Sequence, residues 1–236
     1  MSSEWKAKRF WKEAKAEQSD GGFTVSLDGR PVKTPAKQAL ILPTRGFAEA
    51  VAAEWDAQED VIKPHLMPAT KTANAALDKV AVQHAEVADM LADYGDSDLL
   101  CYRADQPEGL IARQAEHWDP MLDWAAKTIG VRLETRTGVM HNPQDAEALQ
   151  IMRQRTHALS AFELAAFHDL VSLTGSWVLG YAASLKARPA PELWALSRLD
   201  ENWQAEQWGR DDAAEALAAV KEQSFMHASR MFMLSR

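Results

Sequence analysis

A long run without a charged side chain, from Leu170 to Leu185, constrains the fold of this chain more than any other segment. A helix that is apolar nearly all round is either buried on every side or crosses a membrane. Spanning a bilayer takes about 20 consecutive apolar residues, and this run is shorter and contains several hydroxyl side chains. We therefore predict that residues 160–187 form one central helix buried in a helical domain. Gly175 and Gly180 weaken such a helix, and we expect a neighbouring helix to approach closely there.

Composition excludes several classes of protein. The 236 residues are enough for one large domain or two small ones. A net charge of -8 argues against a nucleic-acid binder, which normally has a basic face. The single cysteine, Cys101, cannot form an intramolecular disulfide, and its apolar neighbours predict a buried, inert thiol. The N-terminal sequence lacks the apolar segment of a secretion signal, and we expect a bacterial cytoplasmic protein with no membrane insertion.

The first part of the chain has the pattern of a small β unit. Residues 8–42 contain alternating apolar and polar side chains, and Asp28-Gly29 is a dipeptide typical of a tight hairpin turn. The helical period begins at Thr44, a predicted N-cap. Thr70 is the predicted cap of a second helix, which continues to about residue 94.

From residue 108 the sequence is helical almost to its end. Pro120 should interrupt the helix predicted over 108–129, either as a kink or as the first residue of a new helix capped by Asp119. The fold class that follows is α+β, with a small β/α domain at 1–100 and a helical domain at 101–236. The last helix, 211–234, ends in a segment rich in methionine and phenylalanine. That segment either docks on the core or forms an adaptable surface for an apolar partner.

The familiar catalytic and phosphate-binding motifs are missing, and we predict no catalytic residue, no metal site and no cofactor. The most informative polar cluster follows Asp200. Glu201, Gln204 and Trp208 are spaced by three and four residues, so a helix would place them on one face. Such a face is either a solvated helix rim or a recognition surface for a protein partner, where tryptophan is enriched.

Several short segments together resemble one known family, the assembly chaperones of F-type ATP synthase that bind the unassembled alpha subunit. The resemblance covers nearly the whole chain, and the segments occur in the family's order. They are Arg9-Phe10-Trp11-Lys12, Leu27-Asp28-Gly29-Arg30 with Val32-Lys33-Thr34-Pro35, Glu54-Trp55-Asp56 with Gln58, Met67-Pro68-Ala69-Thr70, Asp98-Leu99-Leu100-Cys101-Tyr102-Arg103, Trp118-Asp119-Pro120 with Trp124, and Ser197-Arg198-Leu199-Asp200-Glu201 with Gln204 and Trp208-Gly209.

The resemblance implies a noncatalytic protein that shields the apolar interface of the alpha subunit until the beta subunit replaces it. It assigns partner binding to the acidic pair Asp200 and Glu201 and to Trp55, in addition to the face with Gln204 and Trp208. It also implies the mitochondrial matrix as the location of eukaryotic relatives, and we expect a monomer. The alternatives from the residues alone are an enzyme acting on a small molecule in an interdomain cleft, with the two acids as proton carriers, and a permanent subunit of a larger complex.

Overall fold

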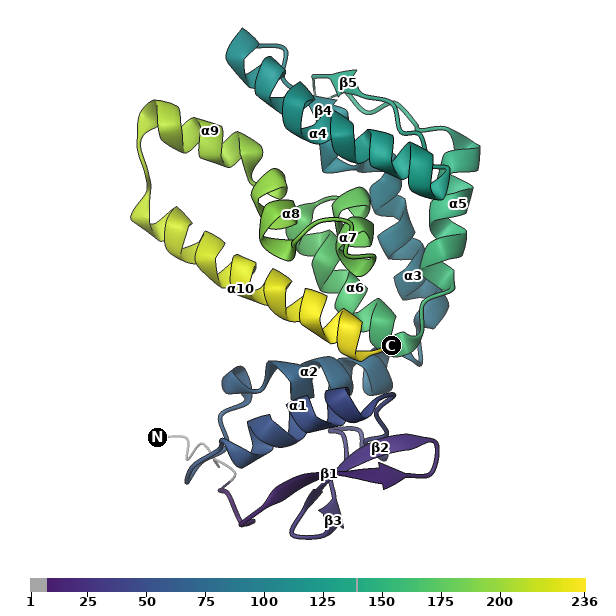
Figure 1. Ribbon diagram of the computed structural model, residues 1–236, viewed down its shortest axis with the longest axis vertical. Coiled ribbons are helices and arrows are strands. Elements are labelled where there is room, and N and C mark those ends of the chain that lie inside the picture. The colour runs from purple at the N-terminus through teal and green to yellow at the C-terminus, as the bar shows by residue number, and fades with distance from the viewer. Residues whose placement is uncertain (1–7, 139) are drawn as a thin grey trace, which may run out of the picture. The chain divides into compact units, whose positions relative to one another are not determined.

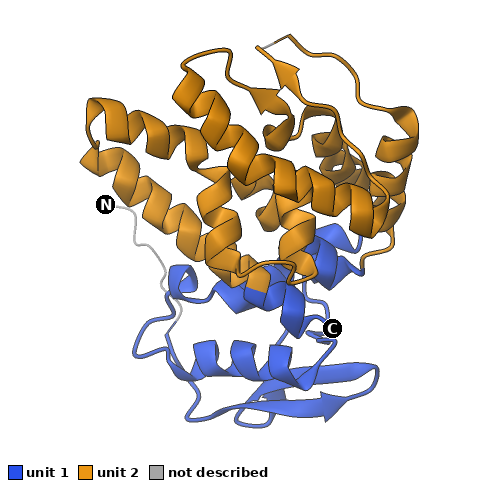
Figure 2. Ribbon diagram, turned by 45° about the horizontal axis from the view of Figure 1, so that its top comes forward, with its two compact units in different colours: residues 1–83, 160–165, 230–236 blue, residues 84–159, 166–229 orange. Residues whose placement is uncertain are grey.

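The computed structural model describes residues 8–138 and 140–236, which are divided between two compact units (Figure 2). The first unit consists of the chain up to Gln83 together with residues 160–165 and 230–236. The second consists of residues 84–159 and 166–229. This arrangement differs from the predicted division between residues 100 and 101, because the first unit ends earlier and includes two segments from later in the chain.

Contacts far apart in sequence attach those two segments to the first unit. The ring of Phe162 packs edge-on against Phe47, with 5.5 Å between ring centroids. The Thr44 hydroxyl donates a hydrogen bond of 2.5 Å to the carbonyl of Leu234. A local sequence pattern carries no information about such pairings, so the predicted boundary could not include them.

The first unit contains a three-stranded antiparallel sheet in the order β1 (Ala14–Ser19), β2 (Gly22–Leu27) and β3 (Arg30–Pro31). The predicted hairpin turn is confirmed, because Leu27 pairs with Arg30 and both turn residues, Asp28 and Gly29, have positive φ. The predicted α+β class is also correct: the sheet is followed by a chain that is mainly helical (Figure 1).

Helix α1 (Arg45–Asp56) packs on β1 and β2. Its predicted cap is confirmed, since Thr44 Oγ1 accepts from the Phe47 amide at 3.1 Å. Helix α2 (Pro68–Ala75) follows the 3₁₀ turn η1 (Pro64–Leu66) and continues into a π turn, η2 (Ala76–Val80). The prediction that Thr70 caps α2 was wrong, because the helix already begins at Pro68. The cap comes from α1, where the Glu54 carboxylate accepts from the Thr70 amide and hydroxyl, each at 2.8 Å.

In the described residues of the second unit, the regular structure is helical apart from one parallel pair of two-residue strands. In chain order its elements are α3 (His84–Ala92), the 3₁₀ turns η3 (Asp93–Ser97) and η4 (Leu99–Cys101), β4 (Tyr102–Arg103), α4 (Glu108–Ile129), β5 (Arg136–Thr137), α5 (Ala146–His157), most of α6 (Ala161–Thr174), α7 (Trp177–Ser184), α8 (Ala190–Ser197), α9 (Leu199–Trp208) and most of α10 (Asp212–Leu234). Among the described residues, none of the helices is long and apolar enough to cross a bilayer.

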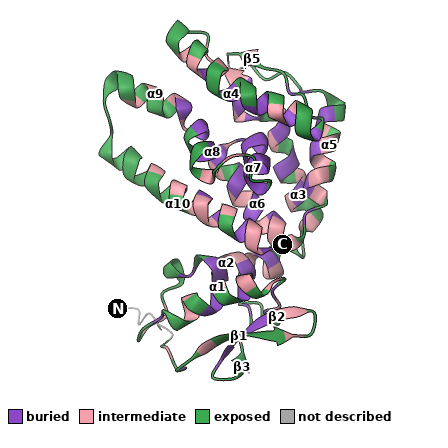
Figure 3. Ribbon diagram, viewed as in Figure 1, coloured by how far each residue is buried: buried purple, intermediate pink, exposed green. Residues whose placement is uncertain are grey.

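Most of the uncharged central run is buried, as predicted, although Ser172 and Leu185 are exposed. The run is not one helix. It divides into α6 and α7 at Gly175, whose φ of 68° is left-handed and therefore favours glycine. Ser176 then caps α7, because its hydroxyl oxygen accepts from the Leu179 amide at 3.0 Å. Every residue of α7 is buried (Figure 3).

The expected close approach occurs at Gly180, and the neighbour is α6. A Cβ atom at this position would lie 2.8 Å from the Val171 side chain and 3.2 Å from the Val171 amide nitrogen. Glycine is therefore required by the packing of α7 on α6.

Replacing Gly180 with alanine should lower the free energy of unfolding by about 1–3 kcal/mol, the usual cost of overpacking a core. Thermal denaturation followed by circular dichroism would measure this effect. An alanine variant as stable as the wild type would mean that the two helices can separate without cost, contrary to the close contact described here.

Asp98 fixes the start of α7 from inside the core. Its carboxylate is fully buried and accepts hydrogen bonds from the Ser176 hydroxyl at 2.7 Å, the Leu100 amide at 3.0 Å and the Val178 amide at 3.0 Å. Burial raises the pKa of Asp98 to about 6, even though these donors lower it. Nearby Cys101 is buried as predicted, and burial raises the pKa of its thiol to about 12.

Pro120 does not interrupt α4, which continues through it to Ile129. The prediction that a new helix begins at Pro120 was wrong, whereas a kink at this position stays a prediction. Asp119, which could have capped a new helix, instead accepts from Arg103 at 2.7 Å. In the last helix, Phe225, Met231 and Phe232 are buried, which confirms that this segment docks on the core.

Candidate functional site

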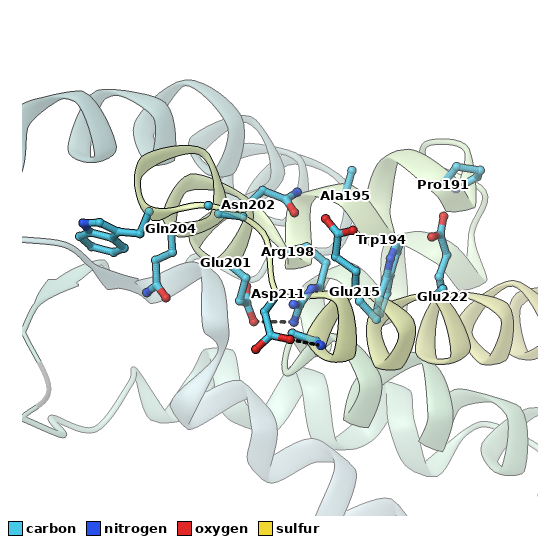
Figure 4. Close-up of a pocket in the computed structure, with 16 residues that line it drawn as sticks. Pro191, Trp194, Ala195, Arg198, Glu201, Asn202, Gln204, Asp211, Glu215 and Glu222 are labelled. Atoms are coloured by element: carbon cyan, nitrogen blue, oxygen red, sulfur yellow. Dashed lines mark hydrogen bonds and ion pairs between the residues drawn. The ribbon is translucent and has the colours of Figure 1, made fainter.

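A groove in the second unit brings together three of the five predicted partner-binding residues, Glu201, Gln204 and Trp208. One wall consists of α8 and α9, and the other is the first half of α10 (Figure 4). The groove has a volume of about 660 Å³. Its lining comprises Pro191, Trp194, Ala195, Arg198, Glu201, Asn202, Gln204, Ala205, Trp208, Gly209, Asp211, Ala214, Glu215, Ala218, Ala219 and Glu222.

Local features of the sequence create this groove. Gly209, with a φ of 95°, ends α9 and starts the turn into α10 (Figure 1). Asp211 then caps α10, because its carboxylate accepts from the amides of Ala213 and Ala214 at 2.8 and 3.1 Å. The two helices are therefore held as a hairpin by residues that favour those exact conformations.

The other face of α9 anchors the helix on α4. The guanidinium of Arg113 lies over the Trp203 ring, 4.5 Å from its centroid, and pairs with Glu206 at 2.7 Å. Buried Leu199 fixes the first turn of α9. Because this face of α9 packs on α4, the face that carries Gln204 and Trp208 is free to line the groove.

Acidic groups dominate the charge of the groove. Its lining includes four carboxylates and a single cationic side chain, Arg198. Arg198 forms an ion pair with Glu201, as Figure 4 shows. Glu215 pairs with Arg210 at 3.3 Å, whereas Glu222 has no ion-pair partner within the described part of the chain. The groove therefore has a negative electrostatic potential next to its apolar surface.

The predicted acidic pair is divided between two tasks. Glu201 is exposed and lines the groove, whereas Asp200 is half-buried and turns toward α4. There its carboxylate accepts from the Gln114 side chain at 2.8 Å, and the same amide group accepts from the Ala104 backbone at 2.9 Å. Asp200 thus helps to hold α9 on α4.

Trp55 belongs to the first unit, while the other four predicted residues belong to the second. Its ring packs edge-on against buried Trp11, with 5.2 Å between centroids. The indole nitrogen of Trp55 is buried and has no hydrogen-bond partner among the described residues. These contacts give Trp55 a packing role, and partner binding at this position stays a prediction.

Sequence reasoning missed the second wall of the groove. It comes from α10, where Ala214, Ala218 and Ala219 face the groove together with Glu215 and Glu222. The available signal was the alanine-rich sequence of residues 213–219, which contains too few large apolar residues for a core helix. The described residues contain no group of three or more histidine, cysteine or acidic side chains that could hold a metal ion.

Comparison with known proteins places this fold in a family. The family described as ATP12 chaperone protein matches residues 8–126, half of the chain. The chain belongs to the ATP12 chaperone family. This confirms the resemblance to the ATP synthase assembly chaperones seen in the sequence.

Solved structures extend the similarity of this ATP12 family member beyond the matched half. Atp12 from Paracoccus denitrificans is 48% identical with a TM-score of 0.95, covering 99% of this chain and 100% of that one. An aspartate-to-lysine mutant of the same protein gives a TM-score of 0.96 at the same identity and coverage. A protein from Agrobacterium tumefaciens is 40% identical with a TM-score of 0.93, covering 97% and 86% of the two chains.

A eukaryotic relative also matches. The mitochondrial protein atp12 of Schizosaccharomyces pombe is 27% identical in an alignment 227 residues long that covers 88% of this chain and 76% of the relative. Membership in a chaperone family points to a protein without enzymatic activity.

Proposed function

We propose that this ATP12 family member binds the unassembled alpha subunit of F-type ATP synthase and covers the surface that the beta subunit later occupies. The observation that supports this proposal is the exposed groove of α9 and α10, where an indole and apolar side chains lie beside acidic groups. The bacterial cytoplasm, where the alpha subunit is made, is the proposed compartment.

The groove suits a holding chaperone on physical grounds. An orphan subunit exposes a large apolar patch, which is an aggregation hazard. A chaperone that shields it requires apolar contact area and a few polar groups that fix orientation. Trp208, with 80% of its surface exposed, offers apolar contact area, and Glu201 offers a polar group that can fix orientation. Release follows when the beta subunit competes for the same surface, and such competition works only if the chaperone binds less tightly than the true partner.

A mixing experiment tests the proposal. Purified alpha subunit from the same source is combined with the protein and analysed by size-exclusion chromatography and light scattering, with the beta subunit as control. We expect a complex with the alpha subunit alone and reduced aggregation, without added nucleotide. If the alpha subunit elutes separately and aggregates at the same rate, the proposal is wrong.

The Glu201→Lys variant should bind the alpha subunit about tenfold more weakly with its fold intact. The substitution breaks the ion pair with Arg198 and places two cations together on an exposed helix face. Isothermal titration calorimetry gives the affinities, and circular dichroism checks the fold. Asp200→Lys is a poorer test, because it also removes the contact with Gln114.

Glu116→Lys is a suitable control for this prediction. Glu116 is an exposed carboxylate in the middle of α4 that does not line the groove, so the change in net charge is the same. An equal loss of affinity in both variants would indicate a general effect of protein charge and would remove Glu201 from the binding surface.

A further inference from the structure

The first half of α10 has a composition that does not match its surroundings. Residues 213–220 are apolar except for Glu215, yet all of them are exposed or only half-buried (Figure 3). Leu217 and Val220 have 56% and 59% of their surface exposed. A helix that is apolar on all sides is normally covered by neighbours. The face of this segment that lines the groove, with Ala214, Ala218 and Ala219, is therefore open to a partner.

Both walls of the groove carry small side chains at positions where another helix could lie. Ala195 and Ala205 belong to the wall formed by α8 and α9, and Ala214, Ala218 and Ala219 belong to α10. Helix axes pack about 8–10 Å apart, and small side chains at the contact favour the shorter distances. A volume of about 660 Å³ is sufficient for a few side chains of an inserted segment.

The backbone of the walls decides between an inserted strand and an inserted helix. A bound strand gains its affinity from main-chain hydrogen bonds to an open sheet edge. Here both walls are helices, whose backbone groups are already paired within each helix. Side-chain packing is therefore the main contact that the walls offer, and an amphipathic helix is the partner element that uses it.

Charge specifies that helix further. Glu201 and Glu215 each have an arginine partner, but Glu222 and Asp211 have no ion pair within the described ranges, although Asp211 caps α10. A helix with lysine or arginine beside its apolar face would neutralise these carboxylates, whereas an acidic helix would be repelled.

We propose that the groove between α9 and α10 binds an amphipathic α-helix of the client, with small or apolar residues on the inserted face and basic residues beside it. This inference rests on the proposed function, because the client is the unassembled alpha subunit. It adds the α10 wall to the site and defines the chemical class of the bound segment.

A matched pair of variants on one helix tests the location. Ala214 lines the groove, whereas Ala216 is exposed on α10 outside it. Ala214→Trp should fill the groove and weaken binding of the alpha subunit at least tenfold, and Ala216→Trp should bind within about twofold of the wild type. Both positions are exposed, so circular dichroism and thermal denaturation should show an unchanged fold.

A peptide experiment tests the chemistry without the alpha subunit. The probes are two synthetic alanine- and leucine-based peptides of about 20 residues, which is above the length at which isolated helices are marginal in water. One carries lysines beside its apolar face, and the other carries glutamates at the same positions. Fluorescence anisotropy should show that the lysine peptide binds the wild type and Ala216→Trp but not Ala214→Trp, and that Glu222→Lys weakens its binding.

The outcomes separate this inference from the proposed function. If the alpha subunit binds the wild type and Ala214→Trp equally well, the groove assignment is wrong and the proposed function stands. If the alpha subunit does not bind but the lysine peptide binds in the expected pattern, the groove chemistry stands and the client is another protein. Equal binding of both peptides, or equal loss in both tryptophan variants, would overturn the inference.

Discussion

Replacing Trp177 with alanine should lower the free energy of unfolding by about 4 kcal/mol, the usual cost of removing a large buried aromatic side chain. Trp177 is fully buried in α7. Its ring stacks on Tyr181 with 4.5 Å between centroids, and its indole donates to Thr156 Oγ1 at 2.9 Å. The substitution would leave a cavity at the centre of the second unit. Chemical denaturation with urea would give the change in free energy.

Trp208 provides the matched control, because the same substitution occurs at an exposed tryptophan. Trp208→Ala should change the free energy of unfolding by no more than about 0.5 kcal/mol. It should nevertheless weaken binding of the alpha subunit, since Trp208 lines the groove. If the two variants lost similar stability, α7 would not be the centre of the core.

Asp98→Ala is expected to cost about 3 kcal/mol, because it leaves buried donors without an acceptor. The amides of Leu100 and Val178 have fixed positions in the core, so they cannot turn to another partner. The hydroxyl of Ser176 can rotate and should recover part of its loss. Asp98→Asn should also destabilise, since the side-chain amide would direct an N–H group at a donor. Urea denaturation at neutral pH measures both variants, and wild-type stability in either would contradict the network.

The same carboxyl group predicts a dependence on pH. The pKa of Asp98 is raised from 3.8 to about 6 in the folded protein, so the folded state binds more protons than the unfolded state between these values. The contribution of Asp98 to stability is therefore fully present below about pH 4 and is lost as the pH rises through 6. The loss amounts to about 3 kcal/mol.

Folding lowers the pKa of other carboxyl groups, so their contribution to stability changes with pH in the opposite sense. The effect of Asp98 must therefore be measured as a difference between the wild type and a variant. A hydrogen bond from His157 lowers the pKa of Asp89, and backbone amides lower that of Asp28. Subtracting the pH profile of Asp98→Asn from that of the wild type isolates Asp98. A flat difference between pH 4 and pH 7 would mean that the ionised form is no less stable inside this site than in water.

Local sequence determined those features that depend on neighbouring residues. The Asp28-Gly29 turn follows from backbone preferences, and the Thr44 cap follows from a side chain beside its own helix. Burial of the central run follows from its lack of charge, and the common face of Glu201, Gln204 and Trp208 follows from helical spacing. The family resemblance came from short motifs spread along the chain.

Tertiary structure decided the features that depend on residues far apart in sequence. Glu54 on α1 caps α2, and the buried Asp98 accepts hydrogen bonds at the start of α7. The chain can break between α6 and α7 at Gly175 inside the core because Asp98 also accepts from Ser176, the residue that caps α7. The spacing of residues in the sequence predicts which face of a helix each of them occupies, but it does not predict which distant residue each one contacts.

The candidate site shows the same distinction. Sequence shows that Asp200 and Glu201 are neighbours. Only the packing of α9 on α4 determines that Asp200 accepts a hydrogen bond from Gln114 while Glu201 lines the groove. Sequence also identified the face of α9, but not the wall of α10 opposite it. Helical periodicity specifies which side chains share a face, because that depends on one helix alone. Which second helix faces them depends on the packing of the whole unit.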